Sequence, residues 1–131
     1  MIALDSSFLV RALVLGTPED RTLRGWLGRG EQLAVSAISW AEFLCGPLTV
    51  EQASLAAIVV SAQEPFVAHD ATAAAALFNA TGRRRRTFVD CMIAAAAMRR
   101  DQALATSNEP DFRPFVRHGL ALARGATGRQ P

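Results

Sequence analysis

The stretch RRRRTFVDCMIAAAAM, residues 83–98, joins a basic segment, an acid and an apolar run. Four arginines end at Thr87, Asp90 follows three residues later, and the remainder is alanine-rich and almost uncharged. Alanine favours helix, and a helix with so few polar residues has to be buried over most of its surface. The stretch therefore predicts a buried helix from residue 87 to about residue 100, headed by an acid.

Short apolar runs alternate with helical patterns along the rest of the chain. Buried strands are predicted for residues 2–4, 33–38 and 103–106, with an edge strand at 120–122. Helices are predicted, from capping residues and from closing Gly or Pro, near residues 6–15, 19–27, 40–45, 50–62, 70–79 and 87–100. This alternation requires crossover connections, so we predict an α/β fold, a three-layer α/β/α sandwich with a mainly parallel central sheet.

The length of 131 residues suits one domain, which we place at residues 1–123, with residues 124–131 as a disordered tail. No apolar run approaches the ~20 residues that span a bilayer, and the N-terminus does not resemble a signal peptide. Cys45 and Cys91 lie in apolar helical contexts and are interpreted as reduced core thiols. We therefore expect a cytoplasmic protein without a membrane anchor.

Polar side chains follow the predicted strands where these end. Asp5 ends the first strand, Glu42 lies just past the second, and Asn108 and Asp111 lie just past residues 103–106. Asp90 begins the helix that leads into that last strand. Ligands of open α/β sheets gather outside the carboxyl ends of the strands, so we expect these side chains at one edge. Oxygen ligands without Cys or His spacing favour Mg²⁺ or Mn²⁺ over Zn²⁺.

Helix capping is a simpler interpretation of the same acids. Ser39 with Glu42 and Thr87 with Asp90 have the spacing of a capping box, and Asp5 could be a plain N-cap. Against this, the helices that these acids begin are apolar, so the acids border the core. Crowded carboxylates also repel one another, and helix N-termini favour the ionised form that a divalent cation requires.

The arginine run Arg83–Arg86 has two interpretations. It is either a solvated loop between two helices or a clamp for the phosphates of a nucleic acid beside the acids. Its position immediately before Asp90 favours the clamp. We treat Arg83, Arg84, Arg85 and Arg86 as candidates for contacts with a nucleic-acid backbone.

Four segments, taken in order, resemble the PIN-domain family, and in particular the VapC-type toxins of toxin–antitoxin pairs. They are IALDSSFLV (2–10), VSAISWAEFLCG (35–46), TFVDCMIAAAAM (87–98) and LATSNEPDF (104–112). Each motif alone is loose, but the ordered set covers nearly the whole chain. The resemblance implies a compact α/β/α sandwich and a Mg²⁺- or Mn²⁺-dependent ribonuclease, usually dimeric and inhibited by a cognate antitoxin.

The resemblance also implies site residues. Asp5, Glu42 and Asp90 match the three acids of the family site, and Ser7 matches a small hydroxyl residue two positions after the first acid. The fourth position falls in TSNEPDF. There we favour Asp111 as the acidic contributor, with Asn108 as a neighbouring polar ligand.

The function hypothesis is metal-assisted hydrolysis of an RNA phosphodiester, with Asp5 and Asp90 as primary ligands. Glu42 completes the shell or acts as a base toward the attacking water. One competing hypothesis is a non-catalytic α/β module that binds nucleic acid or protein and whose acids are helix caps. The other is a phosphotransfer or phosphatase domain with Asp5 as nucleophile, although Ser7 is not a second acid and the chain has no Lys.

Overall fold

The computed structural model describes residues 1–124, and their strands form one four-stranded parallel sheet. The strand order is β3-β2-β1-β4, and the strands are β1 (Ile2–Leu4), β2 (Leu33–Ser36), β3 (Ala62–Glu64) and β4 (Ala103–Ala105). Leu4 pairs with Val35 on one side and with Ala105 on the other. The central strands therefore end in step, and the residues that follow them meet at one edge.

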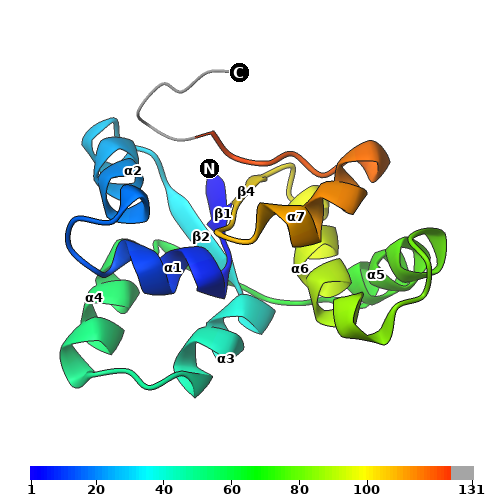
Figure 1. The fold of residues 1–131 in the computed structure, drawn as a ribbon, viewed down its shortest axis with the longest axis horizontal. Coiled ribbons are helices and arrows are strands. Elements are labelled where there is room, and N and C mark those ends of the chain that lie inside the picture. Colours follow the sequence, from blue (N-terminus) through cyan, green and yellow to red (C-terminus); the bar gives the residue numbers. More distant parts are fainter. Residues whose placement is uncertain (125–131) are drawn as a thin grey trace.

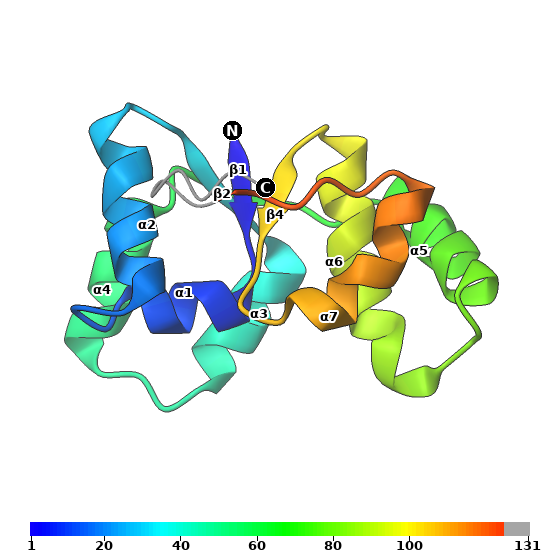
Figure 2. The ribbon, with the colours of Figure 1, turned by 45° about the horizontal axis from the view of Figure 1, so that its top comes forward.

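Helices cover both faces of this sheet (Figure 1). They are α1 (Ser6–Ala12), α2 (Pro18–Gly28), α3 (Ala37–Cys45), α4 (Val50–Val59), α5 (Ala68–Ala80), α6 (Phe88–Arg99) and α7 (Glu109–Phe112), with 3₁₀ turns at Arg85–Thr87 and Arg113–His118. In Figures 1 and 2, α1, α2 and α4 lie on one side of the sheet and α5, α6 and α7 on the other. The predicted three-layer α/β/α sandwich is confirmed. No helix within residues 1–124 is both long enough and apolar enough to cross a membrane.

The two faces of the sheet carry separate hydrophobic cores. Ile2 and Leu4 of β1 pack with Phe8, Leu23 and other side chains of the α1–α2 side. Ala3 points the other way, into a core that contains Ala94 and Ala97 of α6. Small side chains on both sides of this contact let the alanine-rich helix lie close to the sheet. The buried helix predicted from residues 87–100 is therefore present.

Several predicted element boundaries were wrong. Strand β2 ends at Ser36, because the Ser36 hydroxyl accepts a hydrogen bond from the Ser39 N–H at 3.0 Å and starts α3 at once. The predicted helix at 50–62 ends at Val59, and its last position belongs to β3. Residues 120–122 make only one parallel bridge, between Leu104 and Leu122.

Cys45 is exposed and not a core thiol, while Cys91 is buried as expected. The predicted tail falls, from residue 125 onward, outside the described residues.

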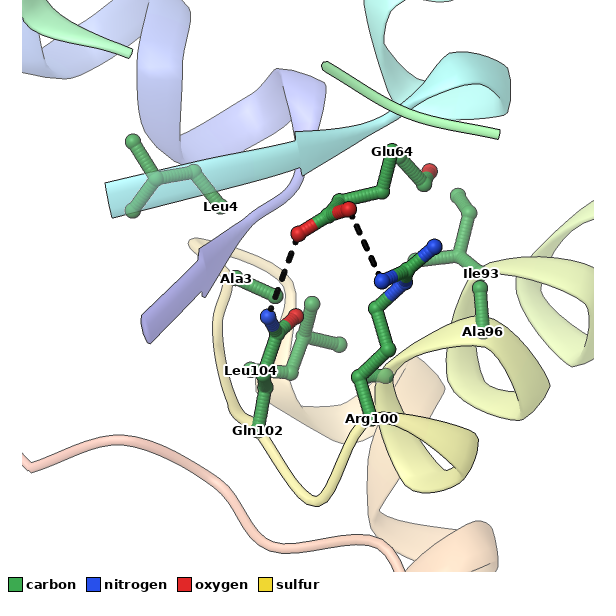
Figure 3. A pocket seen from close by; sticks show the side chains of 10 residues that line it. Ala3, Leu4, Glu64, Ile93, Ala96, Arg100, Gln102 and Leu104 are labelled. Atoms are coloured by element: carbon green, nitrogen blue, oxygen red, sulfur yellow. Dashed lines mark hydrogen bonds and ion pairs between the residues drawn. The ribbon is translucent and has the colours of Figure 1, made fainter. Parts of the chain in front are cut away.

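Strand β3 went unpredicted because its sequence, AQE, has no apolar run. A polar cluster fastens it instead (Figure 3). Glu64 accepts from the Arg100 guanidinium at 2.9 Å and from the Gln102 side-chain amide at 3.5 Å. Arg100 directly follows α6, and Gln102 directly precedes β4. The cluster therefore links the edge strand β3 to the turn that leads into β4, the strand at the opposite edge of the sheet.

Candidate active site

Asp5 lies at the end of β1 with only 4% of its surface exposed. Its Oδ1 accepts from the Phe8 N–H at 2.9 Å and from the Ser7 hydroxyl at 2.8 Å. Its Oδ2 accepts from the Thr106 hydroxyl at 2.6 Å. Burial raises the pKa of Asp5, and these hydrogen bonds oppose the rise. Asp5 is therefore an N-cap, as the simpler interpretation predicted, and it is also fixed by a residue that follows β4.

Asp90 lies in the first turn of α6, and a short turn joins the other end of α6 to the start of β4. The N-terminus of α6 therefore lies near the edge where the strands end. Within residues 1–124, no side-chain hydrogen bond or ion pair reaches the Asp90 carboxylate. Partial burial raises the pKa of Asp90 to about 6, and the charges of Asp111, Glu42 and Asp5 add to the rise. Asp90 is thus close enough to all three acids to be affected by their charge.

The capping-box interpretation fails for Asp90. Thr87 precedes the helix but makes no capping hydrogen bond, and its hydroxyl donates to the Arg84 carbonyl at 2.7 Å. It also fails for Glu42, because the N-cap of α3 is Ser36 and not Ser39. The exposed Glu42 carboxylate instead accepts from the Ser6 hydroxyl at 3.2 Å.

Asn108 and Asp111 follow β4, and both are exposed. The Asn108 N–H donates to the Thr106 hydroxyl at 3.0 Å, and the Asp111 N–H donates to the Asn108 carbonyl at 3.0 Å. Asp111 lines a surface hollow together with Asp90. Of the two candidates for the fourth site position, Asp111 is the one whose charge acts on Asp90.

The sequence analysis missed Thr106. The Ser7 and Thr106 hydroxyls each donate their single proton to Asp5. No proton is left for a hydrogen bond between the two hydroxyl oxygens, which lie 3.3 Å apart. Thr106 follows β4 as Asp5 follows β1, and the Asp5 N–H donates to the Ala105 carbonyl at 3.0 Å. The rule that led to Asp5 could therefore have led to Thr106.

The model of the PIN domain family matches residues 2–115. The chain belongs to the PIN-domain family. PIN domains are generally nucleases. A search of curated proteins finds no match.

Solved structures share the fold of this PIN domain. One of them is the structure of VapBC2 from Rickettsia felis bound to a DNA fragment from the promoter. It has 21% sequence identity and a TM-score of 0.69, and the match covers 94% of this chain and 98% of that chain. FitAcB from Neisseria gonorrhoeae has 21% identity, 95% and 97% coverage and a TM-score of 0.68. VapBC-1 from nontypeable Haemophilus influenzae has 16% identity, 97% and 99% coverage and a TM-score of 0.72. At these identities the matches establish the fold.

The arginine run of this PIN domain is exposed and lies beside the acids. Arg84 and Arg86 line the same hollow as Asp90 and Asp111. Arg83 has a left-handed backbone with φ 57° and donates to the Asn79 side chain at 2.9 Å. Arg84 and Arg86 are therefore the two members of the run that the fold brings to the acids.

The donor set of this PIN domain fits a hard divalent cation. Within residues 1–124, no three side chains of His, Cys, Asp or Glu already stand closely enough together to hold an ion. The acids nevertheless come from different elements to one edge, without Cys or His. Burial raises the pKa of Asp90, and the charges of the other three acids add to the rise. One lone pair on Asp5 Oδ2 and the whole Asp90 carboxylate are left for a ligand. Such oxygen donors are those that Mg²⁺ and Mn²⁺ take in proteins.

Proposed function

We propose that this PIN domain, at residues 1–123, is a Mg²⁺- or Mn²⁺-dependent endoribonuclease. We further propose that it is the VapC-type toxin of a cytoplasmic toxin–antitoxin pair. The observation that supports the nuclease activity best is the Asp90 carboxylate. It pairs with no cation within the described residues, and burial and three other acids raise its pKa to about 6. Strongly perturbed acids of this kind gather at functional sites.

In this proposal, Asp5 and Asp90 hold the ion, and Asp111 completes the acidic set. A bound Mg²⁺ or Mn²⁺ supplies an activated water and stabilises the negative charge that develops on the phosphate. Ser7 and Thr106 keep Asp5 in one orientation, because each donates to a different carboxylate oxygen. The exposed Glu42 carboxylate accepts a proton from the attacking water or completes the ligand set.

Arg84 and Arg86 bind the RNA backbone in this proposal, since they line the hollow that contains Asp90 and Asp111. Guanidinium groups pair with phosphate oxygens and position the strand without reading its sequence. Arg83 and Arg85 extend the positive charge of the same segment. Cleavage specificity then depends on the shape of the RNA around the scissile bond.

A cognate antitoxin is proposed as partner, together with a homodimer. The similar structures include a toxin–antitoxin complex from Klebsiella pneumoniae, with 22% identity and a TM-score of 0.68. The antitoxin is proposed to cover the apolar surface of α1, α2 and α4. Leu15 and Ile58 are 80% and 79% exposed on that side, and a large exposed apolar surface marks an interaction site.

The competing binding module is weakened by the geometry, because its acids had to be helix caps. Glu42 and Asp90 cap no helix within the described residues. Asp5 as a phosphotransfer nucleophile is equally poorly supported, because its two oxygens already accept three hydrogen bonds and it is almost fully buried.

The test is cleavage of a single-stranded RNA by the purified chain while Mg²⁺ or Mn²⁺ is titrated. Asp90→Asn should lower the cleavage rate by about a hundredfold or more at saturating metal, because it removes a charged ligand. Asp101→Asn is the matched control. Asp101 is exposed, lies just beyond the other end of α6 and has a φ of 54°, which Asn tolerates.

Activity of Asp90→Asn within a few-fold of the wild type would contradict the proposal, as would wild-type cleavage that a chelator leaves unchanged. RNA binding without cleavage at any metal concentration would favour the binding module.

A further inference from the structure

Glu19, in the first turn of α2, has no role in the site described so far. Its side chain is only 16% exposed. Glu19 Oε2 accepts from the Ser107 hydroxyl at 2.7 Å and from Arg11 Nε at 2.9 Å. The other carboxylate oxygen is buried without a hydrogen-bond partner within the described residues. A carboxylate held in this way has an energetic cost that an ordinary surface acid does not have.

A chain of hydrogen bonds leads from Glu19 to Asp5. The backbone N–H of Ser107 donates to the Ser7 hydroxyl at 3.1 Å, and this hydroxyl donates to Asp5 Oδ1 at 2.8 Å. Ser7 has one proton, and it goes to Asp5, so Ser7 can only accept from Ser107. The direction of every bond from Ser107 to Asp5 is therefore fixed, and Glu19 is the acceptor that holds the Ser107 side chain.

The same contacts hold the segment that follows β4. Thr106 donates to Asp5 Oδ2 at 2.6 Å and accepts from the Asn108 N–H at 3.0 Å. This segment leads directly to Asp111, whose charge acts on Asp90. Three consecutive residues are thus fixed by hydrogen bonds, and the bond to Glu19 is the one that connects them to α2.

The charge of Glu19 suits an acceptor. Partial burial by itself would raise the pKa of Glu19, but the hydrogen bond from Ser107 and the Arg11 guanidinium lower it overall. Glu19 therefore stays ionised. Hydrogen bonds to an ionised acceptor are stronger than those between neutral groups.

We propose that Glu19 is a positioning residue of the active site. By accepting from Ser107, it holds the segment after β4 against Ser7, which sets the orientation of Asp5 and the place of Asp111. The inference rests on the proposed function, because a positioned carboxylate serves the metal and RNA chemistry assigned to these acids. Outer partners of ligating carboxylates commonly change metal affinity when they are lost.

The test compares Glu19→Ala with Glu19→Gln, whose amide oxygen still accepts from Ser107. Glu19→Ala should speed the hydrogen exchange of the Ser107 and Asn108 amides by about tenfold or more, because their segment is released. It should weaken Mn²⁺ binding, measured by electron paramagnetic resonance of the free ion, by about 10- to 100-fold. It should also lower kcat for RNA cleavage more than it raises KM. Glu19→Gln should restore most of each value.

Asp20→Ala is the matched control. Asp20 is the neighbouring acid of α2, but it pairs with Arg24 at 2.9 Å and accepts from the Gly16 N–H at 3.0 Å, away from Ser107. This variant should lower the stability of α2 without a selective change at Ser107 and Asn108. If Glu19→Ala does not fold, Ser107→Ala removes the same hydrogen bond from the other side and should produce the same change at the Asn108 amide.

Wild-type exchange and Mn²⁺ affinity in Glu19→Ala would overturn the inference, as would Glu19→Gln behaving like Glu19→Ala. A wild-type chain that neither binds Mn²⁺ nor cleaves RNA would overturn the proposed function. The amide exchange would then still decide whether Glu19 positions the segment.

Discussion

Asp70 and Asp90 occupy the same position, the third residue, of two adjacent helices, α5 and α6. Asp70 is fully buried, accepts from Arg99 at 2.6 and 3.2 Å, and accepts from the Val67 N–H at 3.0 Å. Burial would raise the pKa of Asp70, but Arg99 and the Val67 N–H lower it overall. Partial burial and the charges of three other acids raise the pKa of Asp90 to about 6, and within residues 1–124 no guanidinium pairs with its carboxylate. The fold supplies one acid with a cation and leaves the other without one, which separates a structural carboxylate from a candidate ligand.

The largest effect is expected from removing the charge of Asp70, the acid of the two that pairs with an arginine. Asp70→Asn removes the charge from a fully buried carboxylate that accepts from Arg99 and from the Val67 N–H, which should lower the free energy of unfolding by about 1 to 3 kcal/mol. Urea unfolding measures this loss. Asp101→Asn, at an exposed position, should change it by less than about 0.5 kcal/mol. A loss below about 1 kcal/mol for Asp70→Asn would show that the Asp70–Arg99 pair does not hold α5 to α6.

Adding a cation should make Asp90 resemble Asp70. At a Mg²⁺ concentration ten times the dissociation constant, binding to the folded state alone should stabilise the wild type by about 1.4 kcal/mol. The melting temperature should rise by about 3 to 5 °C. Asp90→Asn should lose most of this rise, whereas Asp70→Asn should keep it above its own lower baseline. Equal shifts in wild type and Asp90→Asn would place the ion elsewhere.

Without metal, the pH dependence of stability should separate Asp90 from Asp70. The pKa of Asp90 is about 6 in the folded state and about 3.9 in the unfolded chain. Its contribution is therefore fully present below about pH 4 and is lost as the pH rises through 6. Asp90→Asn should remove this loss and be more stable than the wild type at pH 7.5 by on the order of 1 kcal/mol, after screening by solvent.

At pH 4 the two proteins should be nearly equal in stability. Asp70 has the opposite sign, because its lowered pKa gives stability that disappears only as the pH falls. The difference between Asp90→Asn and the wild type therefore isolates Asp90. Parallel stability curves from pH 4 to 7.5 would contradict the coupling of Asp90 with the other acids.

The comparison also shows what the sequence could and could not predict. The rule that ligands gather where parallel strands end led to Asp5, Glu42, Asp90 and Asp111, and the charges of the other three do act on Asp90. Local spacing was misleading, since Thr87 and Asp90 have the pattern of a capping box and Val67 and Asp70 do not. In the structure, the Asp70 carboxylate accepts from the Val67 N–H, whereas no capping hydrogen bond joins Thr87 and Asp90.

The reason for this reversal lies in the backbone. Val67 is extended, with ψ 170°, so its N–H is open to Asp70. Thr87 belongs to a 3₁₀ turn. Its ψ is 0° and not the extended value of an N-cap residue, and it makes no capping hydrogen bond. The rule about strand ends could have led to Thr106 as a candidate. Its hydrogen bond to Asp5, and the bond between Ser107 and Glu19, depend on side-chain directions across 101 and 88 positions of sequence, which no local pattern contains.

The smallest effect concerns the arginines beside Asp90. If Arg84 and Arg86 formed ion pairs with Asp90, as Arg99 does with Asp70, their loss would lower the stability of the fold. If they bind RNA, the double variant Arg84→Gln, Arg86→Gln should leave stability unchanged and weaken RNA binding. The logarithm of the affinity should then depend less steeply on the logarithm of the salt concentration, with the slope reduced by about 1.4 for two phosphate contacts on a single strand.

Arg83→Gln is the control for this measurement, because Arg83 donates to Asn79 and does not line the hollow. It should change the salt slope by less than half as much. Among residues 1–124, the charges that shift the pKa of Asp90 are those of acids, and no arginine lowers it. The arginines are therefore near Asp90 without neutralising it, which leaves the carboxylate available for a cation and the guanidinium groups available for phosphate. A loss of stability in the double variant with an unchanged salt slope would reverse this assignment and make the arginine run a structural partner of the acids.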